Sequence, residues 1–187
     1  MGVSIHYKGM IREDRIAPLC EELCDIAGSV GWAFQDIDDA EKGLHGMILL
    51  PKSEMEPVPF LFDSKGRVHS LADLIVGWNE GDFLCVAVKT QFAGCAEHVW
   101  LCGLLRHIQR TYMPGLEVVD EGGFWEGGDQ QELQKRMDSL DRMIKQFGAV
   151  LEQASMDVVI DKNDVDAVAD FVEKVAEKFH REKREGE

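Results

Sequence analysis

The sequence predicts an α+β fold: an antiparallel or mixed β-sheet covered by helices, followed by two long C-terminal amphipathic helices. Short apolar segments typical of strands alternate with helical patterns over roughly the first 120 residues. The turn sequence Asp63-Ser64-Lys65-Gly66 predicts a hairpin, which excludes an all-parallel sheet. After residue 130, apolar residues recur three and four positions apart, as on one face of a helix.

The first half of the chain is expected to hold one long helix among short strands. Residues 13–30 carry an apolar stripe of helical spacing, and Gly31 suits a left-handed cap at the end of that helix. Ser70 is expected to cap a short helix over 71–78. Strands are expected at residues 3–7, 32–37, 46–51, 60–62 and 67–70.

The second half is expected to be mainly helical. A strand over 83–89 leads into a helix over 93–112, and a further strand covers 116–120. Asp129 caps the longest helix, 130–153, with Glu132 three residues later. Its stripe consists of Leu133, Met137, Leu140, Ile144, Phe147 and Leu151. A short strand is expected at 158–160. A last helix over 162–183 follows, capped by Asp161, with a stripe of Val165, Val168, Val172, Val175 and Phe179.

These elements suggest one α+β domain over residues 1–153 and a helical extension over 154–187. The two apolar stripes could pack on the domain, on each other or on a second copy of the chain. The partner we expect is therefore a second copy, in a homodimer formed through helices 130–153 and 162–183.

Charge and composition exclude several classes of partner. Thirty-five acidic residues face twenty basic ones, a formal net charge of -15, so the mean field repels phosphate. We therefore expect no nucleic-acid binding. No apolar run is long enough to span a bilayer, so we expect no membrane insertion. Five cysteines without paired spacing favour a soluble cytoplasmic protein with reduced thiols.

Common catalytic signatures are missing from the sequence. It contains no Walker-type loop, G-x-G-x-x-G, H-E-x-x-H, G-x-S-x-G or C-x-x-C pattern. Any site must therefore be found among less specific groupings of residues.

The first grouping is the acidic, glycine-rich segment 120–129. Asp120, Glu121 and Glu126 could hold a divalent cation such as Mg²⁺ or Ca²⁺, or act as acid and base, beside an apolar wall that includes Trp125. The alternative is structural: Gly122-Gly123 forms a hairpin turn and Asp129 serves only as a helix cap. We favour the structural reading for most of these carboxylates.

The second grouping lies on one face of the helix 93–112. Cys95 could be a thiol nucleophile near the helix N-terminus, with His98 taking its proton. Cys95 and Cys102 are roughly 10 Å apart along the axis, so Cys95, His98 and Cys102 cannot share one zinc ion. His98 and Cys102, four residues apart, could bind a metal together with ligands from elsewhere. The alternative, which we favour, is a buried core face.

The third grouping follows the strand 83–89. Lys89 and Thr90 stand at its carboxyl end, before a helix, where α/β sheets often bind ligands. With Trp125 they are the candidates for a ligand pocket. A helix cap and a salt bridge are the structural alternative.

The function expected from the sequence is a non-catalytic binding or regulatory module of the bacterial-cytosol type, acting through protein or small-ligand contacts. The alternative is a small metal-dependent or cysteine-dependent hydrolase or transferase. It would use the carboxylates of 120–126 or the Cys95 and His98 pair.

Overall fold

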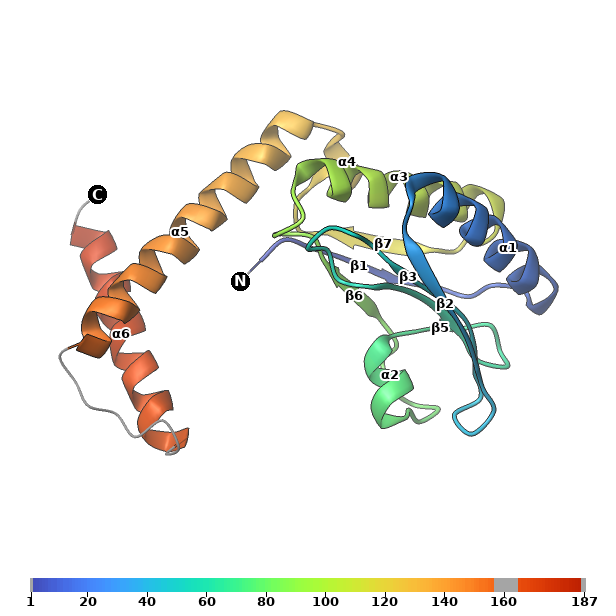
Figure 1. Cartoon of the computed structure of the whole chain (residues 1–187), viewed down its shortest axis with the longest axis horizontal. Coiled ribbons are helices and arrows are strands. Elements are labelled where there is room, and N and C mark those ends of the chain that lie inside the picture. Colours follow the sequence, from blue (N-terminus) through green and yellow to red (C-terminus); the bar gives the residue numbers. More distant parts are fainter. Residues whose placement is uncertain (1, 157–164, 186–187) are drawn as a thin grey trace. The chain divides into compact units, whose positions relative to one another are not determined.

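The computed structural model describes residues 2–156 and 165–185, and its elements are labelled in Figure 1. By its internal contacts the chain forms two compact units, Met1–Met137 and Asp138–Glu187, which divide within a helix rather than at residue 153. The first unit contains antiparallel sheets and helices, so the predicted α+β class is confirmed.

The first unit contains the strands and most of the helices. In chain order these are β1 (Ser4–Lys8), α1 (Glu13–Val30), β2 (Ala33–Asp39), β3 (Leu44–Leu50), β4 (Val58–Phe62), β5 (Val68–His69), α2 (Leu71–Val76), β6 (Val86–Lys89), α3 (Cys95–Thr111), β7 (Glu117–Asp120), α4 (Phe124–Gly127) and the first turns of α5 (Gln130–Met156). One antiparallel sheet has the order β6-β1-β7, and the other has the order β2-β3-β4-β5.

The three-stranded sheet buries one face. Because side chains alternate along a strand, every second residue points inward toward α3. The inward row consists of Val3, Ile5 and Tyr7 on or beside β1, Val86 and Val88 on β6, and Val118 and Asp120 on β7. Asp120 is the polar member of this row, and it lies opposite Ile5. The register therefore brings a carboxylate under α3.

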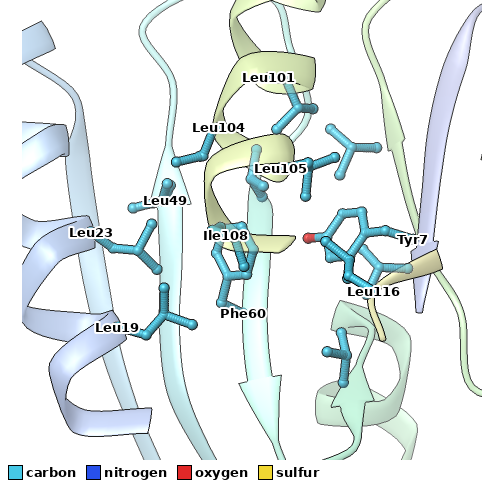
Figure 2. Packing of buried hydrophobic residues seen from close by; sticks show 14 of the residues in the cluster. Tyr7, Leu19, Leu23, Leu49, Phe60, Leu101, Leu104, Leu105, Ile108 and Leu116 are labelled. Carbon is cyan, nitrogen blue, oxygen red and sulfur yellow. The ribbon is translucent and has the colours of Figure 1, made fainter. Parts of the chain in front are cut away.

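One hydrophobic core spans both sheets (Figure 2). Leu19 and Leu23 of α1 and Leu101 and Leu105 of α3 point onto the strands and are fully buried. The Tyr7 hydroxyl donates a hydrogen bond of 2.5 Å to the carbonyl of Pro59 and so links β1 to β4. Burial raises the pKa of the Tyr7 phenol well above its ordinary value, so the hydroxyl keeps the proton that it donates at neutral pH.

Several local predictions are confirmed. Gly31 ends α1 with a φ of 70°, and its N–H caps the last turn. Ser70 caps α2 and forms a reciprocal capping box with Asp73. Asp129 accepts hydrogen bonds from the backbone N–H groups of Gln131 and Glu132 and so caps α5. Each of these features depends on residues within a few positions of one another.

The hairpin predicted at Gly122-Gly123 is wrong. Residues Phe124–Gly127 form the short helix α4 instead of a returning strand. Gly123 has a φ of 76°, and the N–H of Gly122 donates to Asp120 Oδ1 at 2.6 Å. The Asp120 side chain thus turns the chain into a helix by a local hydrogen bond that the glycine pair alone did not indicate.

The second unit holds the remainder of α5 and the helix α6 (Val165–Glu185). Both predicted C-terminal helices are thus present. The strand predicted at 158–160 and the cap Asp161 lie outside the described residues. On the predicted stripes, Val175 is buried, whereas Ile144 and Val172 each expose 40% of their surface and Val165 exposes 77%. No helix among the described residues is long and apolar enough to cross a membrane.

Gly66 lies in the hairpin between β4 and β5, and Gly43, between β2 and β3, is a matched control for substitutions at Gly66. Both have positive φ, 75° and 64°. A Cβ on Gly66 would lie 1.9 Å from the carbonyl oxygen of Ile11, whereas one on Gly43 would meet nothing within 4 Å. We expect Gly43→Ala to lower the free energy of unfolding by about 1–2 kcal/mol, the cost of a left-handed residue. Gly66→Ala should cost clearly more, because the Ile11 backbone must also move.

Urea unfolding of both variants measures this difference. Equal losses of stability would show that the contact between Gly66 and Ile11 does not constrain the hairpin.

Candidate functional site: a buried His98 network

A polar cluster lies between α3 and the three-stranded sheet. Ser4 pairs with Lys89 and Ile5 with Asp120, so Thr90 and Asp120 lie on opposite sides of β1. His98 belongs to the first turns of α3 and faces the sheet. Thr90, His98 and Asp120 are all buried, with His98 at 0% exposure. Residues from three separate parts of the sequence thus meet inside the first unit.

The imidazole of His98 has a neighbour at each nitrogen. Its Nδ1 lies 2.7 Å from Thr90 Oγ1, and its Nε2 lies 3.0 Å from Asp120 Oδ1. The Thr90 hydroxyl also donates to the carbonyl oxygen of Val3 at 3.2 Å. Although Nε2 approaches the carboxylate closely, it makes no hydrogen bond of good geometry. The ring therefore has a short hydrogen bond at Nδ1 and lacks a well-formed hydrogen bond at Nε2.

Asp120 is held by several donors. Its Oδ1 accepts from the N–H of Gly122, and its Oδ2 accepts from the N–H of Trp125 at 2.8 Å. Burial by itself raises the pKa of this carboxyl group. The close approach of the His98 ring and the hydrogen bonds donated by the Trp125 and Gly122 N–H groups outweigh burial, so the pKa lies below its ordinary value. Asp120 is consequently ionised at neutral pH.

Cys102 lies one helical turn after His98 and completes the cluster. One ligand atom from each of His98, Cys102 and Asp120 lies within 4.8 Å of the other two. Burial, and then the charge of Asp120, raises the pKa of the Cys102 thiol to about 12. Among the described residues, this is the group of three potential metal ligands that come together at one point.

The remaining candidate carboxylates lie elsewhere. Glu121 Oε2 accepts a hydrogen bond from the N–H of Ser4 at 2.9 Å, and its Oε1 lies 3.4 Å from Nε2 of His6. Glu126 is exposed on α4. Asp120, Glu121 and Glu126 do not come close enough together to share one ion.

Cys95, Lys89 and Trp125 also have their own environments. Cys95 is buried at the start of α3, and its Sγ lies 3.7 Å from the carbonyl oxygen of Gln130. The Lys89 ammonium lies 5.2 Å from the ring centre of Phe92. The guanidinium of Arg106 lies over the Trp125 ring, 5.1 Å from the ring centre. In the described structure, the side chains of the ligand-pocket candidates Lys89 and Trp125 thus contact other residues. Thr90 joins the His98 network through its hydroxyl, and Trp125 joins it only through its backbone N–H.

A second buried histidine was not singled out by the sequence. His69 Nε2 lies 3.3 Å from Asp63 Oδ2, its Nδ1 lies 3.4 Å from Asp73 Oδ2, and Trp78 packs on its ring. Arg67 forms an ion pair with Asp63, in which Nε of Arg67 lies 2.6 Å from Oδ2 of Asp63. Asp63 belongs to the hairpin turn between β4 and β5, and Asp73 belongs to the cap of α2. Because the sequence predicts both the turn and the cap on either side of His69, it could have indicated this cluster.

Comparison with known proteins identifies no relative: no family model, no curated protein and no solved structure matches the chain.

The ionised Asp120 predicts an acid-dependent loss of stability. Because its folded pKa is lowered, its contribution is complete above the unfolded pKa of about 4 and is lost as pH falls through the folded value. We expect Asp120→Asn to lower the free energy of unfolding by about 1–3 kcal/mol at neutral pH. The difference from wild type should shrink below about pH 4.

Asp129→Asn is the matched control for this substitution. Asparagine caps helices about as well as aspartate, so this variant should stay within about 0.5 kcal/mol of wild type. Urea unfolding of metal-free protein across acidic and neutral pH measures both effects. A difference between wild type and Asp120→Asn that does not change with pH would contradict the assignment.

Proposed function

We propose that this protein is a non-catalytic binding module that self-associates through the helices of its second unit. The observation that carries the proposal is the exposure of Ile144 and Val172 in the middle of the apolar stripes of α5 and α6. A soluble helix normally buries such a stripe, so these positions require a covering surface.

The size of the second unit favours a second copy as that surface. The unit comprises Asp138–Glu187, and its described elements are helices. A helix pair of this length encloses too little apolar surface to be stable by itself, and small helical units commonly gain stability by oligomerisation. Two such pairs related by a twofold axis can close a four-helix bundle around their stripes.

The stripe pattern also favours like pairing with like. In α5 the apolar residues Leu140, Ile144, Phe147 and Leu151 alternate four and three positions apart, the spacing of helices that pack side by side over several turns. The high negative charge of the chain argues against acidic partners such as nucleic acid. A twofold dimer buries the same apolar positions on both copies without requiring any further partner.

A non-catalytic role is favoured by the burial of the catalytic candidates Cys95, His98 and Asp120. His98 and Asp120 form the one pair of candidate catalytic groups that meet in the described structure, and both are buried under α3. The nitrogens of His98 face Thr90 and Asp120, and Cys95 is itself buried. Hydrolysis or group transfer requires a nucleophile that a substrate can reach, so this arrangement favours a binding function over the hydrolase or transferase alternative.

Charged substitutions on the stripes provide the test. The double variant Ile144→Glu with Val172→Glu places two carboxylates at the proposed interface, where burial of unpaired charge is strongly unfavourable. We expect wild type to have twice the chain mass of 21.0 kDa in sedimentation equilibrium, and the variant to dissociate at least roughly 100-fold more readily.

The control is Gln146→Glu with Ala169→Glu, which adds the same charge at exposed positions of the same helices. It should remain dimeric. A monomeric wild type at the highest measurable concentration would overturn the proposal, as would a stripe variant that dimerises as tightly as the control.

A further inference from the structure

We propose that His98, Cys102 and Asp120 form a binding site for a single transition-metal ion, for which Zn²⁺ is the best match. This site is independent of self-association, because all three ligands belong to the first unit. The ion would join the helix α3 to the end of strand β7.

The donor atoms define the class of metal. The cluster offers an imidazole nitrogen, a thiol sulfur and a carboxylate oxygen. Mg²⁺ and Ca²⁺ prefer all-oxygen sites, whereas zinc is commonly held by Cys, His and Asp. Two atoms bound to the same zinc ion at 2.0–2.3 Å can be at most about 4.6 Å apart. The ligand atoms of His98, Cys102 and Asp120 lie within 4.8 Å of one another, so only a small movement of these side chains is needed for all three to bind one ion.

The hydrogen bonds of His98 prepare Nε2 to be a ligand. When the Thr90 hydroxyl gives its proton to the Val3 carbonyl, Nδ1 must carry the ring proton in order to donate to Thr90 Oγ1. The Nε2 lone pair of a neutral ring then faces the Asp120 carboxylate, an unfavourable contact unless a cation lies between them. Nε2 is fully buried and lacks a well-formed hydrogen bond. Metal-bound histidines typically donate their other N–H in this way.

The charges of the cluster favour a divalent ion. Asp120 carries one negative charge, and Cys102 loses one proton to solvent when its sulfur binds the metal. Two negative charges and one Zn²⁺ sum to zero, which suits a buried location. Three protein ligands leave the fourth position of a tetrahedral zinc site to a water molecule, which is the ligand number of catalytic zinc sites. Because all three ligands are buried away from any substrate, we nevertheless assign the ion a structural role.

The chain packs closely around the cluster at Gly122. A Cβ on Gly122 would lie 3.1 Å from His98 Cε1, 3.0 Å from Asp120 Oδ1 and 2.5 Å from Leu133 Cδ1. Glycine therefore allows the chain after β7 to pass beside the ligands. The Asp120 Oδ2 atom is held by the N–H of Trp125, which fixes the carboxylate with Oδ1 toward His98.

Cobalt substitution tests the site in the full chain, prepared without a polyhistidine tag. Co²⁺ added to metal-free protein should bind at one equivalent per chain. It should give a sulfur-to-cobalt charge-transfer band in the near ultraviolet that added Zn²⁺ removes. Cys102→Ala should lose that band and weaken metal binding by more than roughly 100-fold, because changes even to residues behind a ligand cost about 10–100-fold.

Cys95→Ala is the matched control, since Cys95 is a second buried thiol on the same helix. It should keep the band and the affinity. Zn²⁺ should raise the Tm of wild type and Cys95→Ala but not that of Cys102→Ala.

X-ray absorption of the zinc-loaded wild type gives a measurement that does not depend on a variant folding. One sulfur and a remaining shell of nitrogen and oxygen support the site. Wild type without the charge-transfer band, a band that survives in Cys102→Ala, or a zinc shell without sulfur would each overturn it. In those cases a proton shared by His98 Nε2 and Asp120 Oδ1 fills the same place.

Discussion

The imidazole of His98 is the contact on which the first unit depends most. Strands in a sheet are about 4.8 Å apart, so β6 and β7, on either side of β1, are separated by about 10 Å. The side chains of Thr90 and Asp120 cannot span that distance, but a ring with a nitrogen at each end can. Without it, a buried hydroxyl and a buried carboxylate would both lose a partner, which is far costlier than losing a contact at the surface.

Asp120 extends this constraint to the segment that follows β7. Its two oxygens bind N–H groups of Gly122 and Trp125, so the chain turns at once into α4 and then reaches Asp129, the cap of α5. One carboxylate thereby connects the sheet, α3 and α4. The lining of the cluster includes Leu133, in the part of α5 that belongs to the same unit. A metal ion bound to Asp120 would tighten all of these connections together.

The proposed roles of the two units follow from opposite physical conditions. In the first unit, polar groups capable of chemistry are buried and bonded to one another, which suits rigidity more than turnover. In the second unit, apolar groups that ordinarily seek burial, such as Ile144 and Val172, remain partly exposed. The proposed binding module, which has a rigid interior and self-associates through a helical surface, accounts for both conditions.

The local features could be predicted from the sequence alone: the cap at Gly31, the cap at Ser70, the cap at Asp129 and the α+β class. The sequence also marked Thr90, His98 and Asp120, but as members of three separate groupings. That they meet follows only from the folded chain, because the placement of β1 between β6 and β7 depends on pairing between residues 79 or more positions apart. Burial of Asp120 beneath α3 also explains the helix found where a hairpin was expected, since the buried carboxylate accepts the N–H groups of Gly122 and Trp125 and so turns the chain into α4.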